Sequence, residues 1–178
     1  MAAKGPEGFE FKLNFKTPKL DLKGKTDKQK AAMKKALTLG MQRGLNRIET
    51  SLSQALDRAM ESSTWTWTSR TTIRQNGSTA GSPRDIVDTG KLKGSKKLKT
   101  RFLQSGGSVA IEYNSPYARL VHFGGVITPY GRKGRALVTL PARPWITATL
   151  EGGYGIEKFG ADEILNQAIQ EAWQAQFG

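Results

Sequence analysis

A long run of regularly spaced apolar residues between Asp27 and Glu61 constrains the fold more than any other feature of the chain. The apolar side chains recur every three or four positions, which is the period of one face of an α-helix. Thr26 or Asp27 can cap the first turn through a side-chain oxygen. The pattern predicts one long core helix, and its buried stripe comprises Met33, Leu37, Met41, Leu45, Ile48, Leu52, Leu56 and Met60.

Two further features of this segment bear on what the helix contacts. Gly40 and Gly44 lie four residues apart beside the stripe, and each costs about 1 kcal/mol of helix propensity relative to alanine. They predict a bend or a close helix crossing. The opposite face is basic, which indicates either a solvated back or a surface that faces DNA or acidic protein neighbours. Its cations are Lys28, Lys30, Lys34, Lys35, Arg43 and Arg47.

The segment Phe9–Lys16 alternates apolar and polar residues, which is the period of a half-buried strand, and Pro18 ends it. We expect residues 1–25 to form an N-terminal arm ahead of a single domain at 26–178. The strand can pair with its own sheet or add to the sheet edge of a neighbouring subunit. A disordered basic tail is the third alternative.

The centre of the chain is typical of short strands and turns. Ser63–Arg74 is rich in β-forming residues, and Trp65 and Trp67 are placed on one strand face. Such a pair is more often a core or interface anchor than a base-stacking platform. Gln75–Ser82 contains Asn-Gly and a further glycine, which predicts a flexible turn region.

Two hairpins follow. Residues 91–103 and Ser108–Tyr113 predict antiparallel strands joined through Ser105–Gly107. Val126–Tyr130 and Ala136–Leu140 predict a second pair, which places a glycine-punctuated basic tip at 131–135. Because this tip carries no base-reading element, any contact with DNA should be independent of base sequence. The candidates for contact with DNA are Lys91, Lys93, Lys96, Lys97, Lys99, Arg101, Arg132, Lys133 and Arg135.

The last segment predicts an acidic helix that Asp162 can cap. Its apolar stripe can pack on the first helix or on a basic surface of a neighbour. The stripe comprises Ile164, Leu165, Ala168, Ile169, Ala172, Trp173 and Phe177. The fold class is therefore α+β: a long N-terminal helix, a small antiparallel sheet with long loops, and a C-terminal helix.

Composition narrows the possible functions. The 178 residues carry a net charge of +13, which favours a polyanionic partner, although a basic surface can also serve solubility alone. The chain has no cysteine, so disulfides, thiolate metal sites and cysteine nucleophiles are excluded. A single histidine argues against a His-rich metal site. We expect no cofactor, and the absence of a long apolar run predicts no membrane span or signal peptide and a cytoplasmic setting.

Three segments hold the densest local signals. Ser82–Ser95 reads as a loop and turn that includes Asp88-Thr-Gly-x-Leu-x-x-Ser95. Tyr113–Gly125 reads as a strand end, a proline-initiated helical turn and a Gly-Gly stop, and it contains Tyr117-Ala-x-x-x-His-x-Gly-Gly125. Leu140–Ile146, with Pro141-Ala-Arg-Pro-Trp145, should be extended and lie at a sheet edge.

In this order, the three segments resemble the neck and tail-completion proteins, which join head to tail in tailed bacteriophages. The resemblance covers about a third of the chain, and elsewhere it extends only to a long helix in front and a shorter helix behind. It implies a non-enzymatic virion protein that forms a hexameric or dodecameric ring around the DNA channel at the head–tail junction, assembled in the host cytoplasm. The implied partners are sister subunits, the portal-side connector or adaptor, the tail terminator or tail proteins, and packaged double-stranded DNA. The interface candidates are Phe9, Phe11, Leu13, Phe15, Trp65, Trp67, Arg143 and Trp145.

Two other functions are compatible with the sequence. The runner-up is a stand-alone, sequence-independent nucleic-acid-binding protein. The remote alternative is an aspartic protease, because Asp88-Thr-Gly follows Ile86-Val87; the lysines that come next would favour two ionised carboxylates over the shared proton that such enzymes need. His122 lies between Val121 and Phe123 and reads as a structural histidine rather than a catalytic base.

Overall fold

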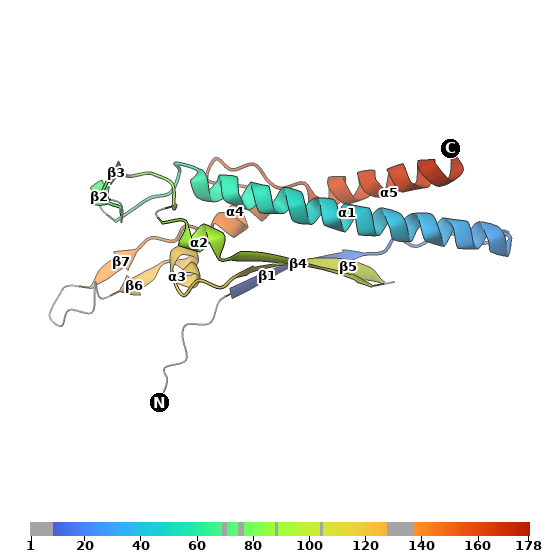
Figure 1. The fold of residues 1–178 in the computed structure, drawn as a ribbon, viewed down its shortest axis with the longest axis horizontal. Coiled ribbons are helices and arrows are strands. Elements are labelled where there is room, and N and C mark those ends of the chain that lie inside the picture. Colours follow the sequence, from blue (N-terminus) through green and yellow to red (C-terminus); the bar gives the residue numbers. More distant parts are fainter. Residues whose placement is uncertain (1–8, 69–70, 75–76, 88, 104, 128–136) are drawn as a thin grey trace, which may run out of the picture. The chain divides into compact units, whose positions relative to one another are not determined.

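The computed structural model describes residues 9–68, 71–74, 77–87, 89–103, 105–127 and 137–178 (Figure 1). The chain divides into two compact units. Unit 1 contains the described residues of Phe9–Glu10, Gln54–Lys97 and Glu112–Phe159. Unit 2 contains those of Phe11–Ser53, Leu98–Ile111 and Gly160–Gly178.

The elements confirm the α+β fold class (Figure 1). The helices are α1 (Asp27–Glu61), α2 (Lys91–Gly94), α3 (Ala118–Phe123), α4 (Trp145–Glu151) and α5 (Ala161–Phe177). The strands are β1 (Phe9–Lys16), β2 (Thr71–Ile73), β3 (Thr79–Gly81), β4 (Lys96–Leu103), β5 (Gly106–Tyr113), β6 (Gly125–Ile127) and β7 (Val138–Leu140). Within the described part of the chain, none of the helices combines the length and apolarity needed to cross a lipid bilayer.

Helix α1 begins where the sequence places its cap. The backbone N–H of Gln29 donates to Thr26 Oγ1 over 3.3 Å, and the N–H of Thr26 donates to Gln29 Oε1 over 3.0 Å. This reciprocal pair is a capping box, which satisfies two backbone donors that the helix itself cannot. The predicted stripe is buried from Leu37 to Met60, and Met33 is half-buried.

The main sheet has the strand order β1-β5-β4. Strands β4 and β5 are joined by only two residues, which requires an antiparallel hairpin. The N–H of Thr17 donates to the carbonyl of Ser105 over 3.2 Å, so the end of β1 lies beside the start of β5. Of the three alternatives for Phe9–Lys16, the structure therefore has the strand in its own sheet.

In unit 2, α1 packs on α5 and on the sheet, and it approaches both closely. A methyl group added at Gly40 would lie 2.6 Å from the Cα of Ile169, and one added at Gly44 would lie 2.6 Å from Leu165 Cδ1. A methyl group on Gly107 of β5 would clash with a methyl group of Leu45. The two helix glycines therefore mark a close crossing, and α5 packs on the first helix as one alternative proposed (Figure 1).

Unit 1 contains an aromatic core around His122. The ring centroids of Phe9 and Trp145 lie 5.2 Å and 4.8 Å from the imidazole, and the Tyr113 ring lies 5.3 Å from Trp145. His122 is 1% exposed, and burial lowers its pKa to about 4. It is therefore neutral at physiological pH, and Thr147 Oγ1 lies 3.4 Å from its Nε2. This environment fits a structural histidine.

Several local predictions were wrong in detail. Trp65 and Trp67 lie outside a regular strand. Trp65 forms an isolated bridge with Arg84, and among the described residues of that segment only Thr71–Ile73 is a strand. The predicted turn at 75–82 contains β3, which pairs antiparallel with β2. These strands are three residues long, too short for an alternating pattern to stand out in the sequence.

Helix boundaries account for the other corrections. Lys91–Gly94 is helical rather than the start of a strand, because Gly90, with φ 75°, turns the chain ahead of it. The extended stretch predicted at 140–146 ends at Pro144, and Trp145 begins α4. At α5, Gly160 rather than Asp162 is the cap residue. Asp162 lies in the first turn, where a negative charge is favoured by the helix dipole.

We predict that Gly40→Ala destabilises the protein, although the helix propensity of alanine is about 1 kcal/mol more favourable than that of glycine. The added methyl group meets backbone of α5, which cannot move aside as a flexible side chain would, and such overpacking costs about 1–3 kcal/mol. The matched control is Gly94→Ala, the last residue of α2, where a methyl group meets nothing within 4 Å. Urea denaturation should show a lower midpoint for Gly40→Ala alone. Equal midpoints for the two variants would contradict the close crossing.

Candidate functional site

Two arginines stack on one indole ring in unit 1. The Cζ of Arg84 lies 3.6 Å from the centroid of the Trp67 ring, and the Cζ of Arg143 lies 3.8 Å from it. Both arginines are buried, and Arg143 Nε donates to the carbonyl of Thr66 over 3.0 Å. A planar guanidinium can stack and donate at the same time, which a lysine ammonium cannot. We call Trp67, Arg84 and Arg143 the arginine clamp.

The electrostatics of the clamp are unusual for buried arginine. Burial lowers the pKa of Arg143 to about 10, and the charge of Arg84 acts in the same direction. The group therefore still carries its charge at neutral pH. Its Nη2 is buried and makes no hydrogen bond. Among the described residues, Arg143 makes no ion pair, so the stacking on Trp67 and the bond to Thr66 are what hold it.

An ion pair fixes the loop that carries Arg84. Arg74 Nη2 lies 2.6 Å from Asp85 Oδ2, and Arg74 also donates to the carbonyl of Val87. Asp85 Oδ1 accepts from the N–H of Val87 over 2.9 Å, which closes a local turn. Burial raises the pKa of Asp85, but the hydrogen bond and charge of Arg74 outweigh it and hold this pKa below its usual value.

The three motif segments converge around the clamp. A pocket of about 370 Å³ beside Trp67 is lined by Thr89, Gly90 and Leu92 of the first segment and by Tyr117 and Val121 of the second. The third segment supplies the clamp residue Arg143, whose N–H donates to the carbonyl of Val121 over 3.0 Å. Segments that are distant in the sequence thus share one site in unit 1.

The second and third segments meet backbone to backbone. A methyl group on Gly124 would lie 2.7 Å from the nitrogen of Ala142 and 2.7 Å from the carbonyl oxygen of Leu140. Gly124 also has φ 71°, which side chains rarely tolerate. Antiparallel pairing of β6 with β7 continues this contact. Gly124 is therefore required by packing, which is a structural role for that motif position.

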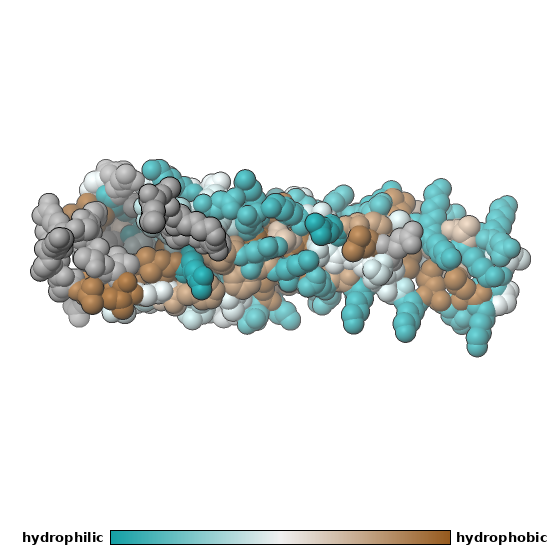
Figure 2. Space-filling model, turned by 90° about the horizontal axis from the view of Figure 1, so that it is seen from below, coloured by the Kyte–Doolittle hydropathy of each residue, from teal (hydrophilic) through white to brown (hydrophobic). Residues whose placement is uncertain are grey.

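Unit 2 presents a basic face on the main sheet. Alternation along β1 and β4 turns Phe11, Leu13 and Phe102 inward. It leaves these cations exposed: Lys12, Lys16, Lys97, Lys99 and Arg101. On that side the strand between them, β5, has the small residues Ser108 and Ala110, followed by the acid Glu112 near its end. Figure 2, seen from below, shows hydrophilic side chains projecting on this side. We define the basic sheet face as Lys12, Lys16, Lys99 and Arg101.

The structure sorts the predicted DNA-contact residues into two groups. Lys93 forms an ion pair with Glu61, and Lys96, whose side chain is 9% exposed, pairs with Asp57 over 2.7 Å. Lys97, Lys99 and Arg101 alternate outward on β4, and Lys91 is exposed on α2. Arg132, Lys133 and Arg135 lie outside the described residues, as does Asp88 of the protease-like motif.

The interface candidates are also distributed unevenly. Trp65, Arg143 and Trp145 are at most 1% exposed and belong to the interior of unit 1. Phe9 lies in the aromatic core there, and Trp67 is half-buried in the clamp. In unit 2, the inward side chains of β1 are half-buried; they are Phe11, Leu13 and Phe15.

Sequence reasoning missed Lys12, Lys16 and Arg84. The alternation of Phe9–Lys16 already assigns both lysines to the polar face, so that signal was present but not used. Arg84 gave no signal, because its ring partner Trp67 lies 17 positions earlier in the chain and no local period joins them.

Comparison with known proteins gives no match: no family model, curated protein or solved structure is similar to this chain. Among the residues that the structure describes, no three His, Asp or Glu side chains gather in a group able to hold a metal ion.

We predict that Arg143→Lys lowers the free energy of unfolding by about 2 kcal/mol. Lysine loses the planar stack on Trp67 and the bond to the Thr66 carbonyl while it keeps the charge. Arg119→Lys, at an exposed position of α3, is the matched control and should change stability by less than about 0.5 kcal/mol. Urea unfolding of the two variants measures both values. Equal losses would contradict a clamp that depends on guanidinium geometry.

Proposed function

We propose that this chain is a structural virion protein of the tailed-phage head–tail junction, a neck or tail-completion protein. In this proposal it forms a ring around the DNA channel and joins the capsid connector to the tail. The observation that carries the proposal is the convergence of the three motif segments on Trp67 and its pocket. Thr89 and Gly90, Tyr117 and Arg143, one or two residues from each segment, lie around this ring and its pocket.

The contacts of the motif residues support a non-enzymatic role. Arg143 stacks and donates to backbone, His122 is held neutral in an aromatic core, and Gly124 permits a close backbone contact. Each of these contacts positions one segment of chain against another. A general base would need a proton-accepting group within reach of a substrate, and the buried imidazole of His122 does not offer one.

The basic sheet face supports a second candidate function, sequence-independent binding of nucleic acid by the isolated chain. Cations two residues apart on a strand lie about 6.7 Å apart. Successive phosphates of one DNA strand are separated by an axial rise of about 3.4 Å, so the spacing of the cations is close to twice this rise. The face carries no base-reading element, so it would contact backbone phosphates only. In the neck proposal the same face is the candidate DNA contact of the ring.

Mass per particle separates the two functions. We predict a closed ring that survives high salt when the purified protein, free of nucleic acid, is measured by light scattering behind a sizing column. Apolar subunit contacts would persist because salt screens charges but does not weaken apolar burial. A monomer at all salt concentrations that binds DNA tightly would contradict the neck proposal and favour the nucleic-acid-binding protein.

A charge-removal series tests the DNA contact in either function. We predict that Lys12→Gln/Lys16→Gln/Arg101→Gln weakens duplex DNA binding at least about tenfold at 0.1 M salt and flattens the salt dependence, because about three phosphate contacts are lost. The matched control, Arg58→Gln/Arg119→Gln/Lys158→Gln, removes the same charge from exposed positions of unit 1. Fluorescence anisotropy with labelled duplexes of two unrelated sequences provides the measurement. Equal weakening by both triples would show that net charge, not this face, governs binding.

A further inference from the structure

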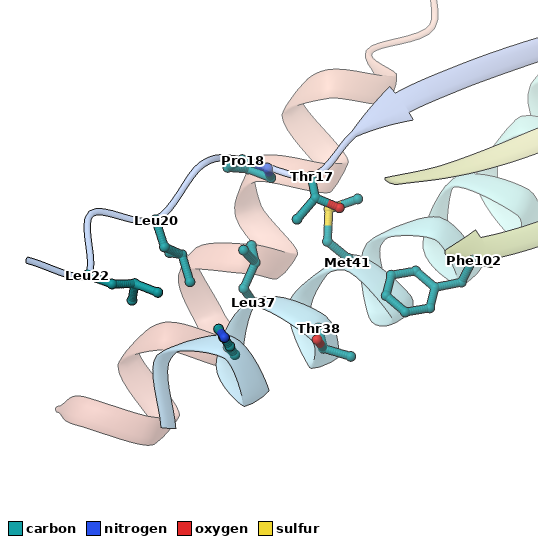
Figure 3. Close-up of a pocket in the computed structure, with 9 residues that line it drawn as sticks. Thr17, Pro18, Leu20, Leu22, Leu37, Thr38, Met41 and Phe102 are labelled. Atoms are coloured by element: carbon teal, nitrogen blue, oxygen red, sulfur yellow. The ribbon is translucent and has the colours of Figure 1, made fainter. Parts of the chain in front are cut away.

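Unit 2 contains an open groove that shares no residue with the arginine clamp or with the basic sheet face. It has a volume of about 430 Å³ and is lined by the segment between β1 and α1, by α1 itself and by β4 (Figure 3). Leu20 of that segment points toward Leu37 of α1, and Phe102 of β4 closes the other side. The lining residues are Thr17, Pro18, Leu20, Leu22, Lys34, Leu37, Thr38, Met41 and Phe102.

The groove has an apolar floor. Leu37 and Met41 belong to the buried stripe of α1, and they form the floor of the groove. Leu20 and Leu22 reach only half-burial, as does Phe102. The groove volume of about 430 Å³ lies within the roughly 300–1,000 Å³ that ligand pockets occupy, so the groove can take apolar side chains of a bound chain.

The rim of the groove is basic. Lys34 lines it directly, and the crossing segment adds the exposed residues Lys19, Lys23 and Lys25. Asp21 is the one acid of that segment. Its carboxylate accepts a hydrogen bond of 3.1 Å from the backbone N–H of Lys23, which places it in a local turn. An apolar floor with a positive rim therefore defines the chemistry of an occupant.

We propose that this groove binds an acidic peptide segment of a partner protein, with leucine or aromatic side chains on the floor and carboxylates at the lysine rim. Charge complementarity is the argument for this occupant. DNA offers no apolar anchor for Leu37 and Met41. A second copy of the chain carries a net charge of +13, which opposes the same rim. The inference does not depend on the proposed function, because it rests on the groove alone.

Three labelled synthetic peptides test the chemistry by fluorescence anisotropy with the full chain. One alternates Glu and Phe, one Lys and Phe, and one Glu and Ser. The Glu–Phe peptide should bind, and the other two should bind at least about tenfold more weakly, a difference of about 1.4 kcal/mol. Equal binding of the Glu–Ser peptide would overturn the proposal, because charge alone would then account for the affinity.

Two matched pairs of variants test the location. Thr38→Trp fills the groove from an exposed position on α1, whereas Thr50→Trp makes the same change at an exposed position on α1 that does not line it. Lys34→Glu reverses the rim charge, and its exposed neighbour Lys35→Glu is the control. Binding of the Glu–Phe peptide should fall at least about tenfold in the first member of each pair and less than twofold in the second. Equal effects within a pair would overturn the proposal.

A second copy as the occupant gives a different result. In that case the protein would self-associate as its concentration rises, Thr38→Trp alone would abolish the association, and the Glu–Phe peptide would not bind. This outcome, measured by light scattering on the same samples, would also overturn the proposal.

Discussion

Burial of the apolar stripe of α1 is the interaction on which the other contacts depend. In unit 2 the stripe from Leu37 to Leu52 is covered by α5 and by the sheet, and burying each large apolar side chain contributes about 1.5–3 kcal/mol. In unit 1 its last turns supply the anchors: the Trp65 indole donates to the Ala59 carbonyl over 2.7 Å, and the Tyr113 hydroxyl lies 3.7 Å from Met60 Sδ. The same helix thus organises both units.

The motif segments add rigidity where regular structure is short. In unit 1 the strands and helices outside the main sheet and α1 have at most seven residues, so hydrogen-bond ladders alone cannot fix this region. Side-chain stacking on Trp67, the ion pair of Arg74 with Asp85 and the backbone contact at Gly124 fix it instead. Each contact joins segments that are separate in the sequence. Together these contacts hold the short elements of unit 1 in place.

Prediction from the sequence succeeded where a period extended over many residues. The stripe of α1, the alternation of β1 and the hairpin of β4 and β5 each repeat a local rule, so neighbouring residues carry the information. It failed at α2 and α4, which have four and seven residues. There, Gly90 and Pro144 set the start of each helix, and one or two turns are too short for a period to stand out. For the candidate site, the sequence named Lys97, Lys99 and Arg101, which are exposed on β4, together with Lys93 and Lys96, which form ion pairs with Glu61 and Asp57.

The sequence by itself determined the fold class, the long helix, and the exclusion of cysteine chemistry, because local periods and composition depend on nothing else. Tertiary structure decided which of the predicted cations form the ion pairs of α1. Glu61 pairs with Lys93 and Asp57 pairs with Lys96. Each pair is more than 30 residues apart in the sequence, which is a longer separation than any local pattern covers. It also decided that three separate motifs form one site around Trp67, because only the folded chain brings Arg143 to the ring. Contacts between distant residues are set by packing, which a single linear pattern does not encode.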